Sequence, residues 1–347
     1  MDTRYTPEQA ELERTARRLV RELGPRTVAD LDDGKRTRHL ADAVRDAGWL
    51  QLRDDCGHGG PLASGVEAAI IAEALAETVA DVSFAGRVLA ADLARRAGAS
   101  PIDGAVVAFS PDLIDAAVVS GPATTAQIYA VDCAAQGFAA AYVLVPEGGG
   151  YRLAQVRVDG VSNGADLTRA IRPLPAGAPL LPVPDQSRLL TRADLDSWST
   201  LGLTLTSADL VGLMRGVLDL TVAYARERRQ YGVPIGSFQA VQHLLAEARC
   251  LMEGAFSVTL YPSWAVDELA PDEARSAGRV AKAYCARAAR TVCETAVQVH
   301  GGMGNTWDCI VHVYLRRALL SSQWFGDDGE QLQQLQRTRV GVPHGFS

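Results

Sequence analysis

Two segments of this sequence combine residue types that can contact a ligand. In residues 298–306, Gly301 and Gly302 interrupt a helical pattern, and glycine lets a backbone approach a bound molecule with no side chain in the way. In residues 224–243, Arg228 lies in a charged run that is followed by glycine and proline. Each feature alone has an ordinary structural explanation, because glycine commonly ends helices and an arginine on a charged helix is usually solvated.

Nucleophilic and metal chemistry have little support in the sequence. His243 and His300 flank apolar helical patterns without a serine or cysteine nucleophile motif, so we expect both to be packing residues. The six cysteines are scattered without a CxxC pair, which indicates free thiols rather than a disulfide framework or a zinc site. We therefore predict no catalytic residue and no metal ligand in this chain.

The two segments belong to the last of three regions with different patterns. Residues 1–100 are predicted to form an N-terminal helical domain, which begins with a capping box at Thr6 and Gln9. Residues 101–190 contain short apolar runs between turn residues and predict a middle antiparallel β domain. Residues 191–347 return to long helical patterns with short connections and predict a C-terminal four-helix bundle. The predicted fold class is α+β.

The residue patterns also set approximate bounds for the elements. The predicted helices cover residues 7–23, 39–47, 66–75, 83–97, 201–229, 237–260, 271–300 and 308–324. The predicted strands are the apolar runs 105–109, 116–119, 128–131, 140–145 and 151–158.

Residues 227–232, Glu-Arg-Arg-Gln-Tyr-Gly, resemble the Glu-Arg-x-Gln-Phe-Gly motif of the acyl-CoA dehydrogenase family, FAD enzymes that desaturate acyl-CoA thioesters. A Phe-Gln pair, the turn with two adjacent glycines and residues 314–318 match the same family. In the order of elements the resemblance covers nearly the whole chain. It implies a site for the adenosine and pyrophosphate end of FAD, formed by Arg228, Tyr231, Phe238, Gln239, Gln298, Gly301 and Gly302.

The resemblance also implies a role for each of these residues. Arg228 would contact the pyrophosphate, because a guanidinium group offers several fixed donors to phosphate oxygens. Tyr231 would pack beside the adenosine half, with Phe238 and Gln239 near the adenine. The glutamine and the two glycines would line the nucleotide of an FAD that the neighbouring subunit mainly holds.

The residues that perform the family's reaction are missing. A carboxylate base must remove the proton alpha to the thioester carbonyl, while hydride from the beta carbon goes to the flavin. In most members this base is a glutamate at the position of Phe325, and in a second group it lies in the zone that matches residues 200–205, which hold no carboxylate. Asp196 and Asp209 flank that zone and are expected to be caps or solvated side chains. The family's Thr-Glu-Pro loop and Trp-Ile-Thr strand, which cover the flavin ring, are also absent.

This asymmetry favours a chain that works with a different partner subunit. In the family each FAD lies across a subunit interface, and this chain keeps only the half that holds the adenosine end. It resembles the short, base-lacking subunit of actinobacterial heteromeric (α2β2) acyl-CoA dehydrogenases that act on steroid side-chain CoA thioesters. The implied partners are a second acyl-CoA dehydrogenase subunit with the catalytic glutamate, an acyl-CoA substrate, and an electron-transfer flavoprotein or similar acceptor.

Two other hypotheses remain open. One is a self-sufficient homomeric enzyme with a relocated base, for which the candidates are Asp196, Asp209, Asp308 and Asp327. The other is a scaffold subunit that has lost FAD.

The net charge of -7 argues against nucleic-acid binding. No apolar run reaches the ~18 residues of a membrane span, and the first residues lack the apolar segment of a secretory signal, so a cytoplasmic location is expected.

Overall fold

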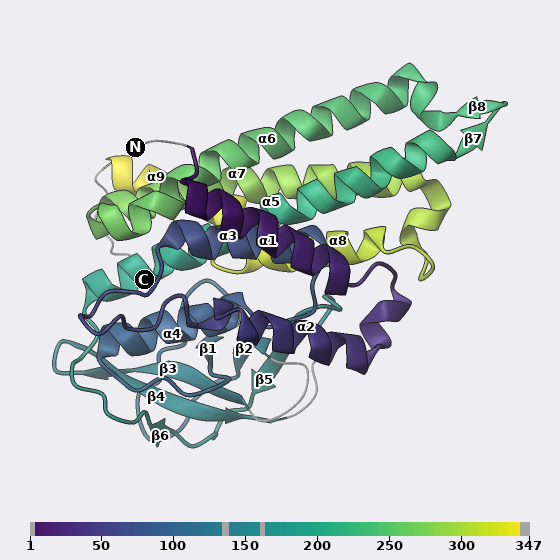
Figure 1. The fold of residues 1–347 in the computed structure, drawn as a ribbon. Coiled ribbons are helices and arrows are strands. Elements are labelled where there is room, and N and C mark those ends of the chain that lie inside the picture. The colour runs from purple at the N-terminus through teal and green to yellow at the C-terminus, as the bar shows by residue number, and fades with distance from the viewer. Residues whose placement is uncertain (1–3, 134–138, 160–163, 341–347) are drawn as a thin grey trace.

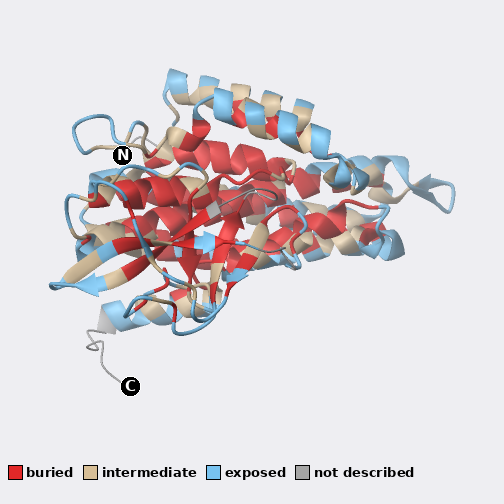
Figure 2. Cartoon of the chain, turned by 90° about the horizontal axis from the view of Figure 1, so that it is seen from below, coloured by how far each residue is buried: buried red, intermediate tan, exposed pale blue. Residues whose placement is uncertain are grey.

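The computed structural model describes residues 4–133, 139–159 and 164–340. A six-stranded sheet lies on one side of the molecule and the long C-terminal helices lie on the other (Figure 1). One hydrophobic cluster joins the N-terminal helices, the sheet and the first half of the long helix α5 (Arg192–Glu227). A second cluster lies within the C-terminal helices. Buried residues therefore run continuously through the centre of the molecule (Figure 2).

The N-terminal region is helical, as predicted. Its described residues form α1 Pro7–Leu23, η1 Ala29–Asp32, α2 Gly34–Asp46, η2 Trp49–Gln51, α3 Gly65–Glu77 and α4 Ala85–Ala97. The predicted capping box at the start of α1 is present, because Thr6 Oγ1 accepts from the Gln9 N–H and Gln9 Oε1 accepts from the Thr6 N–H. α2 begins earlier than predicted because Asp33 caps it, accepting hydrogen bonds from two N–H groups of its first turn.

The sheet has the strand order β5-β2-β1-β3-β4-β6. Its strands are β1 Val106–Phe109, β2 Ile128–Cys133, β3 Ala139–Glu147, β4 Gly150–Val158, β5 Ala170–Leu174 and β6 Leu181–Pro182. The prediction of a purely antiparallel sheet is wrong for one pair, since β1 and β3 are parallel. β2 is antiparallel to β1 on one side, and β3 is parallel to β1 on the other side. The predicted strand at residues 116–119 forms isolated bridges.

The C-terminal region contains the predicted bundle and one further helix. Its elements are α5, β7 Arg229–Gln230, β8 Val233–Pro234, η3 Ile235–Ser237, α6 Gln239–Glu268, α7 Pro271–His300, η4 Gly301–Asn305, α8 Val311–Gln323 and α9 Asp328–Val340. The sequence did not predict α9. α5 has a stretch long and apolar enough to cross a membrane, but 94% of that stretch is buried inside the protein, as expected of a core helix.

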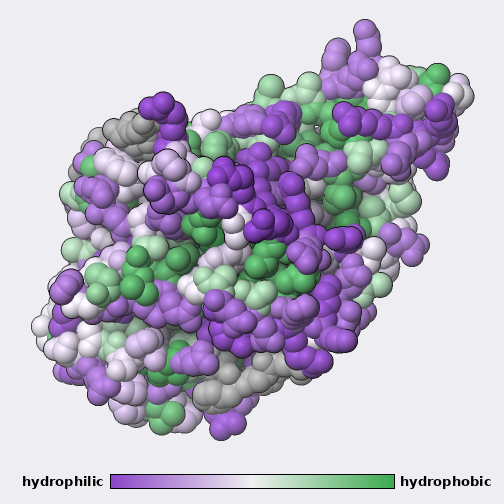
Figure 3. Space-filling model, in the orientation of Figure 1, coloured by the Kyte–Doolittle hydropathy of each residue, from purple (hydrophilic) through white to green (hydrophobic). Residues whose placement is uncertain are grey.

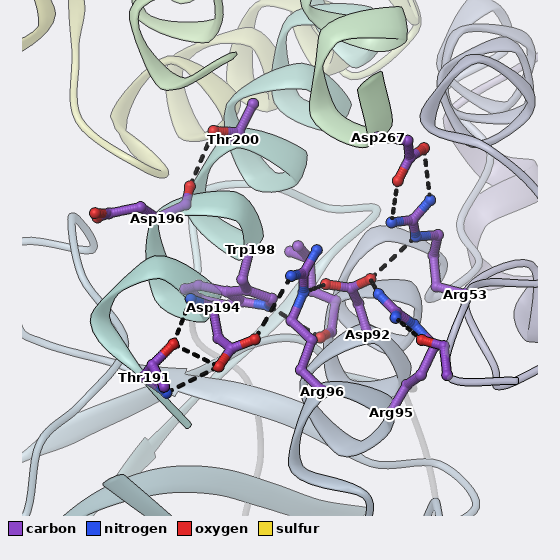
Figure 4. Close-up of polar contacts among 12 residues, drawn as sticks. Arg53, Asp92, Arg95, Arg96, Thr191, Asp194, Asp196, Trp198, Thr200 and Asp267 are labelled. Atoms are coloured by element: carbon purple, nitrogen blue, oxygen red, sulfur yellow. Dashed lines mark hydrogen bonds and ion pairs between the residues drawn. The ribbon is translucent and has the colours of Figure 1, made fainter. Parts of the chain in front are cut away.

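An ion cluster around Asp92 of α4 ties the N-terminal helices to the bundle (Figure 4). The buried Asp92 carboxylate accepts hydrogen bonds from Arg53 at 3.1 Å and from Arg95 and Arg96 at 2.6 Å each. The equally buried Arg53 also donates two hydrogen bonds to Asp267 of α6. Although burial opposes the charge on Asp92, the three guanidinium groups hold its pKa well below the usual range.

Glycines allow α3 and α5 to pack at very short range. A Cβ added at Gly216 of α5 would lie 1.9 Å from the carbonyl oxygen of Glu77 in α3. A Cβ at Gly212 would lie 2.1 Å from the carbonyl oxygen of Glu73. These glycines are therefore required by packing within the chain.

Candidate functional site

The two motif segments lie at the same end of the bundle. α5 ends at Glu227, and the β7–β8 hairpin projects beyond the other elements (Figure 1). α7 runs toward this end and finishes at His300, whose ring stacks on Tyr224 of α5 with 4.3 Å between the ring centroids. The stack holds the glycine turn next to the base of the hairpin. The structure therefore brings together the two segments that the sequence singled out.

The predicted residues of the hairpin end are exposed: Arg228, Tyr231, Phe238 and Gln239. The Arg228 backbone is bonded to Tyr224 and Ile235, but its side chain makes no hydrogen bond or ion pair with any described residue. Its guanidinium group is therefore available to a ligand.

Tyr231 has an unusual conformation for an aromatic residue. It occupies the two-residue turn of the hairpin together with Gly232, and both have positive φ. A positive φ is unfavourable for a residue with a bulky side chain. The Tyr231 side chain is nonetheless 94% exposed and meets Phe238 edge-on at 6.4 Å between centroids. Figure 3 shows hydrophobic residues among the hydrophilic ones on this projecting end.

The glycine turn is open on its outer side. Gln298 is exposed at the end of α7, and Gly301 follows it with a φ of 63°, which favours glycine. Gly302 does not have a positive φ, and a Cβ there would meet nothing within 4 Å. Neither conformation nor packing among the described residues requires glycine at this position. Close approach by another molecule would explain it.

The two histidines differ in their environment. His300 is buried and its Nδ1 lies 2.9 Å from the carbonyl oxygen of Ala296, which confirms it as a packing residue. Burial lowers the pKa of its imidazole. His243 lies exposed on α6, so the prediction of packing was wrong for it.

An aromatic cluster fills the place where a base could have been. Phe325 has a φ of 66° and its ring packs on Phe109 at 5.2 Å and Trp198 at 5.3 Å between centroids. A Cβ at Gly202 would lie 2.0 Å from this ring. Phe325 thus contacts Gly202, which lies in the zone 200–205 that the resemblance matches to the other base position. We name Phe109, Trp198, Trp324 and Phe325 the aromatic plug. The adjacent Trp324 and Phe325 are the only sequence signal for it.

Asp209 is not the cap or solvated residue that the sequence predicted. It is buried on α5, where its carboxylate accepts hydrogen bonds from Arg169, Arg317 and Ser321 at 2.7 Å each. Burial opposes its ionisation, but the two guanidinium groups outweigh burial and lower its pKa. Such a carboxylate is poorly suited to accept a proton. The sequence missed this network because its members are far apart in the chain.

The other candidate carboxylates also have structural roles or lie on the surface. Asp196 is mostly buried and pairs with Arg192 at 3.1 Å and with Arg275, so it too is not a solvated residue. Asp327 caps α9 by accepting from the Glu330 N–H at 2.9 Å. Asp308 is exposed. Among the described residues, no group of three or more His, Cys, Asp or Glu could hold a metal ion.

Comparison with known proteins identifies the family. Residues 6–99 match the model of the acyl-CoA dehydrogenase N-terminal domain, and residues 204–339 match that of the C-terminal domain. FadE34, an acyl-CoA dehydrogenase of Mycobacterium tuberculosis, is 31% identical over 67% of this chain and 33% of its own length. IpdE2 of Mycolicibacterium smegmatis is 34% identical over 45% of this chain and 50% of its own length. The chain thus matches a third to a half of the length of these relatives.

Solved structures match over the full length. The ChsE4-ChsE5 complex from Mycobacterium tuberculosis contains a chain with a TM-score of 0.79 and 25% identity, covering 99% of this chain and all of that one. A variant of the Tcur3481-Tcur3483 steroid ACAD has the same fold, with a TM-score of 0.72 and 21% identity over 96% of this chain and 98% of that one. With both family domains present in order and the fold shared, the chain belongs to the acyl-CoA dehydrogenase family.

Proposed function

We propose that this chain is the base-lacking subunit of a heteromeric FAD-dependent acyl-CoA dehydrogenase. In this proposal it binds the adenosine and pyrophosphate end of an FAD, and a partner subunit supplies the catalytic glutamate and most of the acyl-CoA pocket. The observation that carries it is the contrast between the two halves of the site. In the nucleotide half, the Arg228 side chain has no polar partner among the described residues and the glycine turn is open, whereas Phe325 is packed within the aromatic plug.

The residues at the hairpin end fit the nucleotide of FAD. Arg228 offers unpaired donors for phosphate oxygens, and the edge-on pair of Tyr231 and Phe238 offers apolar surface for an adenine. Gln298 and the open turn at Gly301 and Gly302 would line the same nucleotide. When bound, FAD supplies the acceptor for hydride. The role of this chain is to hold and orient that group across the subunit boundary.

The proposed substrate is an acyl-CoA thioester. The names of two similar structures favour both the heteromer and the steroid class, since one is a ChsE4-ChsE5 complex and the other a Tcur3481-Tcur3483 steroid ACAD. Steroid side-chain CoA thioesters are therefore the first substrates to test. The proposal includes an electron-transfer flavoprotein or similar acceptor for the electrons.

Co-expression with a neighbouring acyl-CoA dehydrogenase gene tests the assembly. The proposal expects both chains to copurify in equal amounts with the flavin absorbance near ~450 nm of such cofactors. A stable two-chain complex without that absorbance would favour the scaffold alternative. The self-sufficient enzyme would be favoured if the chain alone turned over substrate and a single substitution abolished that turnover with FAD retained. The substitutions to test are Asp196→Asn, Asp209→Asn, Asp308→Asn and Asp327→Asn.

Two glycine substitutions distinguish a glycine needed for FAD to approach the backbone from a glycine needed for helix packing. Gly302→Ala is expected to change the free energy of unfolding by no more than about 0.5 kcal/mol, because its Cβ would meet nothing in the described chain. In the two-chain complex the same change is expected to lower the flavin content. Gly216→Ala serves as the packing control and is expected to destabilise the chain by at least about 1–3 kcal/mol. Full flavin content in the Gly302→Ala complex would contradict the proposed approach of FAD to this turn.

A further inference from the structure

A cavity of about 310 Å³ is lined by the first turns of α5, the first half of α7, α9 and residues of β3 and β4. Part of its wall is apolar and includes Leu144, Trp198 and Phe325, so two residues of the aromatic plug line it. Three arginines, Arg192, Arg275 and Arg279, also line it.

Three carboxylates also line the cavity, but among the described residues only Asp196 forms ion pairs with these arginines. Asp196 points away from the Asp92 cluster (Figure 4) and pairs with both Arg192 and Arg275. Glu330 of α9 accepts a hydrogen bond from Gln334 at 2.7 Å. Asp115 lies exposed at the rim and forms no ion pair with Arg279.

Arg279 is therefore a buried cation that forms no ion pair with a carboxylate in the part of the chain that the structure describes. It is 8% exposed, and its hydrogen bond within the described chain is a long one, 3.4 Å from Nη1 to Thr338 Oγ1. The neighbouring Arg275 also has a buried Nε without a hydrogen-bond partner there. Buried charges in proteins are normally paired, because leaving one unpaired costs several kcal/mol. Burial and the repulsion of Arg275 lower the pKa of Arg279 to about 10, although Asp196 and Asp115 oppose this shift in part.

We propose that this cavity binds a small organic carboxylate with an apolar body. The carboxylate pairs with Arg279, and the apolar body packs on Trp198 and Phe325. A single negative charge matches the single unpaired guanidinium group, and planar bidentate pairing suits a carboxylate. The apolar wall favours a hydrocarbon group over a bare inorganic anion. The proposal does not depend on the proposed function, because none of the nucleotide-site residues lines this cavity.

Titration calorimetry on the purified full-length chain tests the binding, with 3-cyclohexylpropanoate as the probe. We expect the acid to bind at least ~10-fold more tightly than its neutral amide, 3-cyclohexylpropanamide, and inorganic phosphate not to compete. Arg279→Gln is expected to weaken binding of the acid at least ~10-fold. Arg249→Gln, which breaks an exposed ion pair on α6, is the control and leaves the affinity unchanged. Equal affinity for acid and amide, unchanged binding by Arg279→Gln, or competition by phosphate would overturn the proposal.

Thermal unfolding of the ligand-free chain gives an independent test. Methionine has the length of the arginine stem without its charge, so Arg279→Met removes an unpaired buried cation. We expect the melting temperature of this variant to rise above that of the unmodified chain. We also expect the acid probe to raise the melting temperature of the unmodified chain but not that of the variant. A lower melting temperature in Arg279→Met would show that the guanidinium group is already satisfied within the chain, and the proposed site would fall.

Discussion

Replacing Asp92 by asparagine is expected to lower the free energy of unfolding by about 3–5 kcal/mol, a large part of the ~5–15 kcal/mol typical of a folded protein. Asparagine keeps the shape of the side chain but removes the charge that three guanidinium groups share. Arg53, which is fully buried, would then keep only Asp267 as an ionic partner. Urea unfolding followed by circular dichroism measures the loss.

Asp42→Asn is the matched control for this effect. Asp42 pairs with Arg45 at 2.9 Å on the exposed face of α2, where water screens the interaction. We expect the unfolding midpoint of this variant to remain close to that of the unmodified chain. Equal losses in the two variants would contradict the structural role assigned to the buried cluster.

The contribution of Asp92 also depends on pH in a defined direction. The pKa of Asp92 is lower in the folded protein than the ~3.9 of an unfolded aspartate. The stabilising effect of Asp92 is therefore complete above about pH 3.9 and is lost as the pH falls below that value. The difference in stability between the unmodified chain and Asp92→Asn should therefore be constant near pH 6 and shrink below about pH 4. A difference that grew on acidification would contradict the assigned direction of the shift.

The second large effect concerns the proposed cofactor. Arg228→Gln in the two-chain complex is expected to weaken FAD binding ~10–150-fold, the range for losing a hydrogen bond to a charged group. The stability of the chain should change little, because the Arg228 side chain contacts no partner within the described chain. Flavin absorbance per mole of complex after dialysis measures the retained cofactor.

Arg229→Gln is the adjacent control. Arg229 lies on the same hairpin and is also exposed, but its Nη1 donates to the carbonyl oxygen of Gly232 at 3.3 Å. We expect this variant to retain FAD. Equal retention of FAD in Arg228→Gln would remove the main contact of the proposed half-site.

Local sequence signals predicted most of the helices. α7 begins at Pro271 and ends at His300 before Gly301, as the proline and glycine at its two ends indicate. The parallel pairing of β1 with β3 was not predictable, because it depends on the side of β1 to which the chain returns after β2. α9 was missed because its sequence is largely polar and lacks a strong apolar period.

The site was predictable only where its residues follow one another in the chain. The hairpin and the glycine turn are short motifs, and the structure brings them to one end of the bundle. The contact between Phe325 and Gly202 joins residues far apart in sequence, so the sequence showed a missing base but not the plug that replaces it. Asp209 was misassigned for the same reason, since Arg169 lies in the loop before β5 and Arg317 lies on α8.

The most direct test of the account is the flavin content and acyl-CoA dehydrogenase turnover of the chain purified alone and with its partner. The account predicts that the chain alone has no measurable turnover, since losing a general base typically costs at least ~10²–10⁴ in rate, and that the two-chain complex is yellow and active. A homomeric preparation of this chain that holds FAD and desaturates an acyl-CoA thioester would contradict it.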